Sequence, residues 1–224
     1  MICRIFYRPF LIILLSIFSS TVVFADQTAI TEDGKKVLLK DDGTWEYVKE
    51  EPKKEDLYDF RKTNWGMTKA QVKKTEKSKL VNEDENLLVY QGTVSGLDCL
   101  IVYIFAEGKL VRAKYIFTKT HSNKNDYISD FNTLKEVLTK KYGKPVKDSH
   151  IWKNDLYRDD YQYWGFAVSL GHLVYFADWE TSNTNLSLAL YGENFEITLA
   201  IEYQSKKLKK LEEKAKEKEA LDEF

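Results

Sequence analysis

The segment NLSLALYGENFEITLAIEY, residues 185–203, decides the fold class, because apolar residues alternate with polar or small ones along it. A period of two is that of a β-strand with one face on a core and one face in water. Gly192-Glu193-Asn194 breaks the alternation midway and predicts a reversal of the chain. The segment therefore predicts two antiparallel strands, Asn185–Tyr191 and Phe195–Tyr203, in a sheet that buries one face.

The residues before this hairpin extend the pattern toward the N-terminus. Alternation predicts two more strands, Gln162–Leu170 and His172–Glu180, joined by a turn at Gly171. Upstream of them, helical spacing of apolar residues predicts a helix. The residues with this spacing are Tyr127, Phe131, Leu134 and Leu138. Tyr142-Gly143-Lys144-Pro145 ends the helix, because Gly accepts the left-handed conformation there and Pro cannot continue a helix.

An earlier part of the chain repeats this order, with a helix followed by three strand-like runs. Thr68 and Gln71 form a capping box, with Met67 and Val72 at the staple positions around it. This pattern predicts a short helix from Lys69 to about Lys77. The strand-like runs that follow it are Leu87–Thr93, Leu97–Phe105 and Lys109–Thr118. The body of the chain therefore consists of a helix followed by an antiparallel meander, twice.

The predicted fold class is α+β, with two helix-plus-antiparallel-meander units packed together. A short β-hairpin, whose turn is Asp41-Asp42-Gly43, is expected before them, and a charged C-terminal helix after them. Charge and proline make the segment after the hairpin a solvated linker. The expected boundaries are 1–25 for a signal peptide, 26–48 for the hairpin, 49–56 for the linker, 57–120 and 121–204 for the two units of the 57–204 body, and 205–224 for the helical tail.

The first 25 residues are typical of a secretory signal. Arg4 and Arg8 precede a short apolar run that begins at Phe10 and ends at Phe24. This run is shorter than the roughly 20 apolar residues that a membrane span needs, although an uncleaved anchor remains the alternative. Cleavage is expected between Ala25 and Asp26. The sequence therefore predicts a periplasmic or secreted protein with no stable membrane anchor after cleavage.

Charge and motif content exclude several classes of function. The formal net charge is −1 at pH 7, whereas a nucleic-acid partner would require a basic face. His121, His150 and His172 lie far apart without metal-ligand spacing, and no phosphate-cradling or dinucleotide motif is present. No metal and no cofactor are therefore expected. Cys99 lies in an apolar run and is expected to be a buried hydrophobic residue.

Two short motifs resemble those of known envelope proteins. Gly66-Met67-Thr68-Lys69-Ala70-Gln71-Val72 is similar to the helix-opening motif of the small outer-membrane assembly lipoproteins of the SmpA/OmlA type, and Tyr142-Gly143-Lys144-Pro145 is similar to the way their helices end. Those proteins, and the β-lactamase inhibitor proteins of similar fold, pack two helices against a sheet. This chain departs from the lipoproteins because no cysteine stands at its cleavage point.

The predicted hairpin also resembles a short leader of uncharacterised exported bacterial proteins, through Gly34-Lys35-Lys36-Val37 and the turn that follows it. The resemblances together imply an envelope or secreted protein that acts by binding other proteins. They imply no particular partner.

Asp178-Trp179-Glu180 is the best candidate for catalysis. Residues i and i+2 of a strand share a face, so both carboxylates would project together beside an aromatic ring. A carboxylate pair is the chemistry of glycoside cleavage, which makes a secreted hydrolase using Asp178 and Glu180 the alternative function. Ordinary polar residues at a strand end give the same pattern, so no catalytic residue is assigned.

The polar face of the second predicted meander is the stronger functional candidate. Tyrosines among small polar residues are typical of surfaces that bind proteins or glycans. An ordinary solvated face, with tyrosine chosen for its β-propensity, is the competing interpretation. The residues predicted to contact a partner are Tyr161, Tyr163, Ser187, Tyr191 and Thr198. The expected function is non-enzymatic binding of a protein or glycan, with inhibition of a foreign enzyme as a further possibility.

Overall fold

The computed structural model describes residues 27–31, 36–40, 42–47 and 58–222, and the chain divides into two compact units, Met1–Glu55 and Asp56–Phe224. The first unit holds a three-stranded antiparallel sheet in the order β1-β2-β3. Its strands are β1 (Gln27–Ile30), β2 (Lys36–Leu39) and β3 (Trp45–Tyr47). Strands β2 and β3 form the hairpin, and β1 adds a third strand that the sequence did not indicate. The expected signal peptide, its cleavage site at Ala25 and Asp26, and the expected linker lie outside the described residues.

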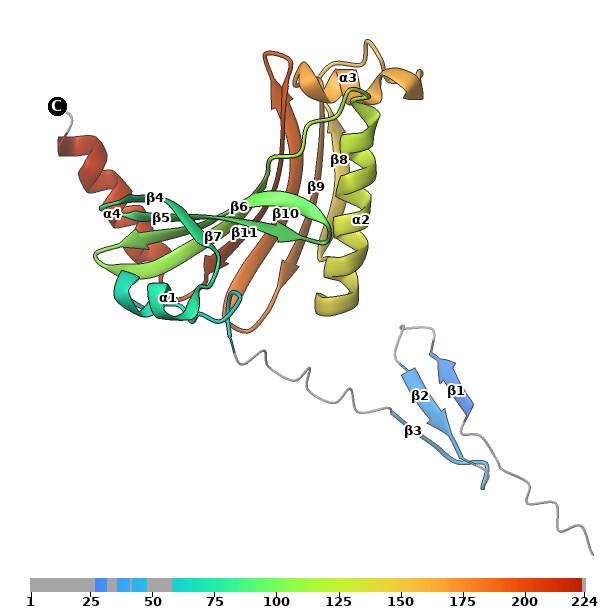
Figure 1. Ribbon diagram of the computed structural model, residues 1–224. Helices are drawn as coiled ribbons and strands as arrows, with labels where there is room; N and C mark the ends of the chain where they lie inside the picture. The colour runs from blue at the N-terminus through green and yellow to red at the C-terminus, as the bar shows by residue number, and fades with distance from the viewer. Residues whose placement is uncertain (1–26, 32–35, 41, 48–57, 223–224) are drawn as a thin grey trace, which may run out of the picture. The chain divides into compact units, whose positions relative to one another are not determined.

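The second unit is built on one eight-stranded antiparallel sheet, in the order β4-β5-β6-β7-β11-β10-β9-β8 (Figure 1). The first half of this unit contains α1 (Lys69–Thr75), β4 (Lys79–Asp84), β5 (Leu87–Val94), β6 (Leu97–Ala106) and β7 (Lys109–Phe117). The second half contains α2 (Asn125–Tyr142), β8 (Lys147–Trp152), the 3-10 helix η1 (Tyr161–Tyr163), α3 (Trp164–Ser169), β9 (Leu173–Glu180), β10 (Thr184–Glu193) and β11 (Glu196–Ser205), and α4 (Lys209–Asp222) follows it. The predicted α+β class with antiparallel sheets is confirmed.

The two meanders join through their last strands, β7 and β11. In this pairing Tyr115 lies opposite Ile201 and Ala113 lies opposite Tyr203, so the buried faces of the two halves are continuous. The sheet twists strongly, and β4–β6 run across the view of Figure 1 while β8–β10 run up it. The two predicted units therefore share a single sheet and a single hydrophobic core.

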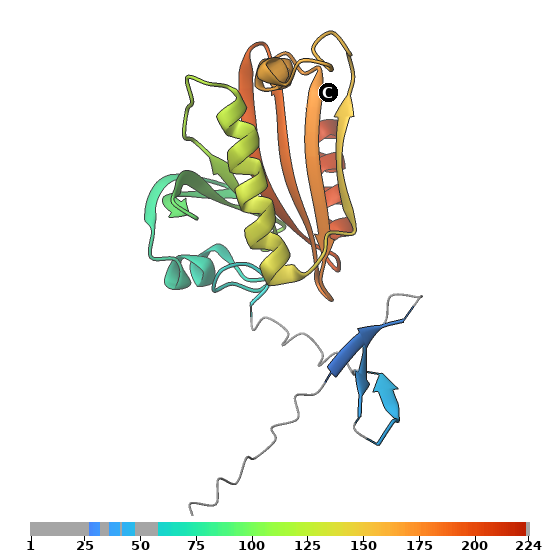
Figure 2. The same ribbon diagram turned by 90° about the vertical axis from the view of Figure 1, so that its right-hand side faces the viewer.

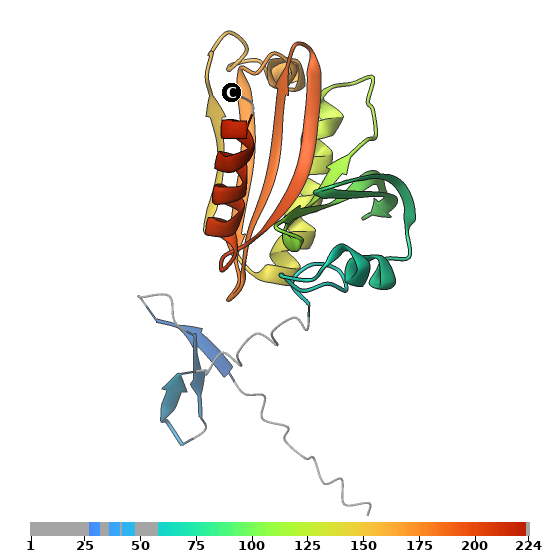
Figure 3. The same ribbon diagram turned by 90° about the vertical axis from the view of Figure 1, so that its left-hand side faces the viewer.

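Helices α2 and α4 lie on opposite faces of this sheet. Figure 2 shows α2 across one face, and Figure 3, from the opposite side, shows α4 over the other. The buried side of α2 consists of Ile128, Phe131, Leu134 and Leu138, at helical spacing. The helix α4 is attached by Glu212, whose carboxylate lies 2.8 Å from the Arg112 guanidinium of β7. Among the described residues, none of the helices is long and apolar enough to cross a bilayer.

Two short motifs position the helices as predicted. At α1, Thr68 accepts a hydrogen bond from the Gln71 amide, and the Gln71 side chain caps the Thr68 amide in return. At the end of α2, Gly143 has a φ of 84° and its amide donates a hydrogen bond to the Thr139 carbonyl.

Cys99 is buried on β6, and burial raises the pKa of its thiol to about 11, as expected of an unreactive core residue.

The predicted strand Gln162–Leu170 is wrong, because these residues form η1 and α3 instead. The Asp160 carboxylate accepts a hydrogen bond from the Gln162 amide and opens the helical segment. The residues on the buried side of α3 are Gly165, Ala167, Val168 and Ser169, which do not alternate. Gly171, with a φ of 74°, ends this helix rather than turning a hairpin.

Strands β4 and β8 were not predicted from the sequence. Both are edge strands of the sheet, and each pairs with a neighbour on one side only. All six residues of β4 are exposed, and on β8 only Trp152 is partly buried. Edge strands carry polar side chains on both faces, so the period-two hydrophobic signal is lost.

Candidate functional site

The structure separates the five residues that were predicted to share one binding face. Ser187 and Tyr191 lie on β10 and Thr198 on β11, where Tyr191 and Thr198 are direct cross-strand partners. Tyr161 and Tyr163 lie on η1, so their predicted place on the sheet face is wrong. This error has the same cause as the wrongly predicted strand, because residues 161–169 form the helices η1 and α3.

The polar side chains of the sheet face bond mainly to one another. One row across five neighbouring strands contains Lys147, Asp178, Ser187, Glu202 and Lys114. The Ser187 hydroxyl donates to Asp178 at 2.7 Å, and Lys114 lies 2.6 Å from Glu202. Arg112, in the next row, donates to the other Glu202 oxygen at 2.8 Å. Arg112 also lies 2.8 Å from Glu212 of α4, so most charges of this face are paired with one another or with the helix that covers part of it.

The surroundings of Asp178 and Glu180 do not favour the acid and base pair of a glycosidase. Asp178 is held by Ser187, and Glu180 is exposed and lies 2.8 Å from Lys206. The hydrogen bond from Lys206 lowers the pKa of Glu180. A general acid in glycoside cleavage needs a raised pKa, so this arrangement does not favour the hydrolase hypothesis.

A cleft lies between the N-terminus of α2 and the η1–α3 segment. It is an open cleft of about 630 Å³, and we call it the aromatic cleft. The residues that line it are Ser122, Asn123, Lys124, Asn125, Tyr157, Gln162, Tyr163 and Phe166. Of the five predicted contact residues, only Tyr163 lines this cleft. Figure 1 shows α3 at the end of the sheet, close to the start of α2.

Backbone contacts fix the walls of the aromatic cleft. A Cβ atom at Gly165 would lie closer than 3.0 Å to the Lys124 carbonyl group and the Asn125 nitrogen, so only glycine lets α3 approach α2 this closely. The Asn125 side chain then joins the two segments. Its Nδ2 donates to the Tyr161 and Gln162 carbonyls, and its Oδ1 accepts from the Gly165 amide at 2.6 Å. The cleft is therefore built on a rigid support.

The aromatic rings around the cleft are in mutual contact. The Tyr157 ring lies 5.6 Å from both the Tyr163 and the Phe166 rings, tilted by 45° to the first and by 82° to the second. The Phe195 ring, at the tip of the β10–β11 hairpin, lies 6.1 Å from the Phe166 ring. These centroid distances are those of favourable aromatic pairs. The rings come from the loop before η1, from η1, from α3 and from the hairpin tip.

Phe195 adopts a backbone conformation that is unusual for a bulky residue. Its φ is 71°, in the left-handed region, and its side chain is 60% exposed. The Phe195 amide donates to the Ser169 carbonyl at 3.0 Å, and the Lys124 ammonium donates to the Phe195 carbonyl at 3.0 Å. These two bonds hold a strained residue in place with its ring largely in water.

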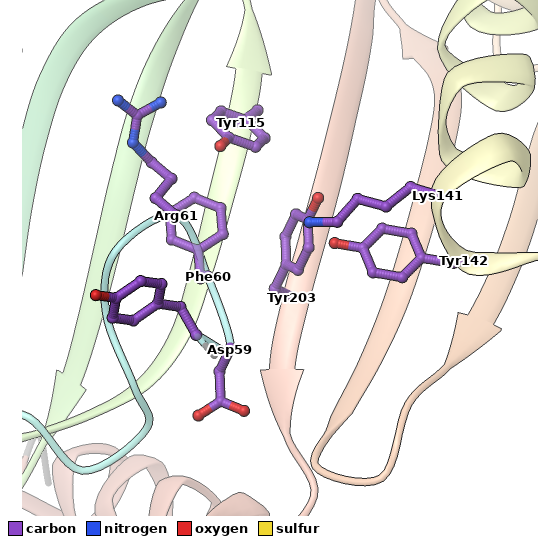
Figure 4. A pocket seen from close by; sticks show the side chains of 8 residues that line it. Asp59, Phe60, Arg61, Tyr115, Lys141, Tyr142 and Tyr203 are labelled. Carbon is purple, nitrogen blue, oxygen red and sulfur yellow. The ribbon is translucent and has the colours of Figure 1, made fainter. Parts of the chain in front are cut away.

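A second, smaller cavity lies where the two halves of the sheet meet. Its volume is about 160 Å³, and Tyr115 of β7 and Tyr203 of β11 line it from adjacent strands. Figure 4 shows Lys141 and Tyr142, at the end of α2, directed toward Tyr203 from the side opposite Arg61. The other residues that line this cavity are Tyr58, Asp59 and Phe60.

Arg61, beside this cavity, is committed to an internal ion pair. Its Nε lies 2.8 Å from the buried Glu76 carboxylate, which also accepts a 2.6 Å hydrogen bond from the Tyr103 hydroxyl. Burial alone would raise the pKa of Glu76, but hydrogen bonds from Tyr103 and Ser78 and the charge of Arg61 outweigh it. They lower the pKa of Glu76 to about 2. We therefore assign this group to stability rather than to ligand binding.

Within the described ranges, no three His, Cys, Asp or Glu side chains converge on a possible metal position. Comparison of the chain with protein-family models, curated proteins and solved structures gives no match. The resemblance to the SmpA/OmlA lipoproteins and the β-lactamase inhibitor proteins therefore stays a prediction.

Proposed function

We propose that this protein is a non-catalytic binding protein that acts outside the cytoplasm and holds its partner in the aromatic cleft. The signal-like first 25 residues support export. Rings from four separate segments, with Tyr163 45% and Phe195 60% exposed, support binding at this end of the second unit. Exposed aromatic side chains on a rigid support are typical of contact surfaces.

The observation that carries this proposal is a bulky aromatic residue, Phe195, that is 60% exposed at a hairpin-turn position where Gly, Asn or Asp is usual. A left-handed backbone at a bulky residue costs about 1–3 kcal/mol, and such strain is found mainly at functional sites. The fold gains little from this residue, because most of its ring is not packed in the core. The two-residue turn of the β10–β11 hairpin requires a positive φ at both Asn194 and Phe195, so the turn accounts for the backbone. Presentation of the ring to a partner beside Phe166 accounts for an exposed phenylalanine at this position.

The cleft supports this function better than the polar sheet face does. On the sheet face the charged groups already have partners in Lys114, Ser187 and Arg112. Tyr191 is the large exposed aromatic residue of that face, and the structure places no second exposed ring beside it on β10 or β11 of the same face. Tyr191 is 46% exposed, nearly the same as Tyr163, so the two tyrosines form a matched pair for a test.

Tyr163→Ala is expected to weaken partner capture at least tenfold, because the loss of a central aromatic contact costs about 2 kcal/mol. The melting temperature should stay within about 2 °C of the wild type, since exposed side chains contribute little to stability. The measurement is quantitative capture from envelope and medium fractions, with each captured component identified and titrated.

Tyr191→Ala is the control for this experiment and should leave capture unchanged. The opposite result, in which Tyr191→Ala abolishes capture and Tyr163→Ala does not, would move the site to the sheet face. Unfolding of Tyr163→Ala would show that this ring belongs to the core and would contradict the proposal.

A further inference from the structure

We propose that the second unit holds a separate site that binds a phosphate monoester group. This inference goes beyond the binding function proposed above, because it concerns a different cavity. The cavity has a volume of about 350 Å³, and we call it the lysine pocket. The residues that line it are Arg61, Lys62, Thr75, Glu76, Lys77 and Tyr103.

A tight turn places two cations at one wall of the lysine pocket. Phe60 and Thr63 exchange two backbone hydrogen bonds, of 3.1 and 2.9 Å, so Arg61 and Lys62 form the two-residue tip between them. Arg61 has a φ of 53°, which is the left-handed conformation that Gly, Asn or Asp usually provides in such a turn. The turn therefore fixes the point from which both basic side chains start.

The other wall belongs to the basic segment 73–79, KKTEKSK, which has four lysines and one carboxylate. The carboxylate, Glu76, joins this segment to the turn, because it lies 2.8 Å from the Arg61 Nε. Lys62 follows Arg61 in the chain, and Lys77 follows Glu76. The ion pair therefore brings two further cations to the same cavity.

The negative charge of Glu76 is offset inside the protein. Its side chain is only 2% exposed and is paired with Arg61. The carboxylate also accepts the Tyr103 hydroxyl at 2.6 Å and the backbone amides of Lys77 and Ser78, each at 2.9 Å. A ligand in the pocket therefore meets little of this charge, and the buried ion pair serves as the rigid frame of the site.

Lys62 and Lys77 are the groups available to a ligand. Both residues are exposed, and within the described ranges neither ammonium has a hydrogen-bond or ion-pair partner. The lining has three cations and one carboxylate, so two positive charges remain. Like charges at one cavity repel each other, and an anion between them offsets the repulsion. The Thr75 hydroxyl already donates to the Val72 carbonyl at 2.9 Å, so recognition at this pocket depends on the lysines.

A phosphate monoester matches both the excess charge and the space. It carries about 1.5 to 2 negative charges at pH 7, and lysine ammonium groups bind it as point charges. The volume lies near the lower end of the roughly 300–1,000 Å³ of small-molecule sites, so the cavity admits the phosphate with part of the molecule that carries it. A neutral ligand would leave the repulsion between the two lysines unchanged. A soluble phosphate ester and the headgroup of phosphatidic acid share this chemistry.

The test is isothermal titration calorimetry of the full chain with glucose 6-phosphate, with glucose as the neutral comparison, at about 0.1 M salt. Co-sedimentation with phosphatidylcholine vesicles, with and without phosphatidic acid, presents the same group on a lipid. At least one phosphate monoester probe should bind, and its counterpart without that group should not. Lys62→Gln and Lys77→Gln should each weaken this binding about fivefold or more, because each removes one charge-assisted contact.

Lys153→Gln is the matched control for these two variants. Lys153 is an exposed lysine that follows β8 in the other half of the unit, and its substitution removes the same charge. Binding should stay within about twofold of the wild type, because distant exposed charges are screened at this ionic strength. All three variants should keep the melting temperature of the wild type, since the substituted side chains are exposed.

The outcomes are distinct from those of the capture experiment on the aromatic cleft. A loss confined to Lys62→Gln and Lys77→Gln supports the lysine pocket, and the probe that binds shows whether the phosphate belongs to a soluble molecule or to a lipid. Absence of binding by both phosphate probes overturns the inference, and so does an equal loss in Lys153→Gln. Loss of phosphate binding in Tyr163→Ala would place the phosphate in the aromatic cleft and would also overturn it.

Discussion

Glu76→Gln is expected to lower the free energy of unfolding at pH 7 by about 3 kcal/mol. The Glu76 carboxylate is buried, lies 2.8 Å from the Arg61 Nε and accepts the Tyr103 hydroxyl at 2.6 Å. Removal of its charge leaves the partly buried Arg61 guanidinium without its counter-charge, which costs more than the pair contributes by itself. Urea unfolding of the variant and the wild type at pH 7 measures this loss.

The pH dependence of the same pair has a definite sign. The pKa of Glu76 is about 2 in the folded chain, below its ordinary value of 4.5. A depressed carboxyl pKa stabilises the fold above the unfolded pKa, and this contribution disappears as the pH falls from about 4.5 toward 2. The difference in the free energy of unfolding between the wild type and Glu76→Gln should therefore be largest at pH 7 and small at pH 2.

Glu180→Gln is the matched control, because Glu180 is also paired with a cation, Lys206, but is exposed. Its unfolding curve should nearly superpose on that of the wild type, as exposed ion pairs contribute little. Equal effects of the two substitutions at pH 7 would show that burial of Glu76 is not what makes its pair important.

Gly165→Ala is expected to have an effect of similar size, about 3 kcal/mol, through steric overlap. The added Cβ would lie closer than 3.0 Å to backbone atoms of Lys124 and Asn125, which cannot rotate away as a side chain can. The overlap would also separate Asn125 from the Gly165 amide, a 2.6 Å hydrogen bond. Thermal and urea unfolding measure the loss, and binding at the aromatic cleft should weaken with it.

Gly108→Ala distinguishes overlap from loss of glycine flexibility. Gly108 has a φ of 73° and no atom within 4 Å of its Cβ position, so only backbone strain of about 1 kcal/mol is expected. An equal loss in the two variants would mean that the close approach of α3 to α2 is not important for stability.

The sequence predicted the sheet where alternation was regular. Strands β10 and β11 alternate between buried and partly buried residues along most of their length, as predicted. The turn that joins them lies at Asn194 and Phe195 rather than at the predicted residues 192–194, because Gly192 and Glu193 still pair within the hairpin. The pattern failed at residues 162–170. There the alternate residues Trp164, Phe166 and Val168 are apolar, but a helix held by Asn125 forms instead. Tertiary hydrogen bonds of this kind have no local sequence signal.

The aromatic cleft could be predicted only in part. Tyr163 was among the predicted contact residues, but on the assumption that it belonged to a strand. Tyr157, Phe166 and Phe195 were not selected, because they come together only when η1, α3 and the hairpin tip pack at one end of the sheet. The aromatic residues near residues 157–166 were visible in the sequence, but their convergence required the fold.

The Glu76 and Arg61 pair also had no signal in the sequence. The two residues are 15 positions apart, in irregular segments on either side of α1. Tyr103, which completes the group, comes from β6. A buried ion pair formed by three separate segments can be found only from coordinates.

The central claim is that the partner lies in the aromatic cleft, and side-chain oxidation by hydroxyl radicals tests it most directly. The free protein and its saturated complex are oxidised in parallel, and modification is quantified by mass spectrometry at Tyr163, Phe195 and Tyr191. We predict that the partner protects Tyr163 and Phe195 and leaves Tyr191, which is equally exposed on the sheet face, unchanged. Protection of Tyr191 with no change at Tyr163 and Phe195 would contradict the account.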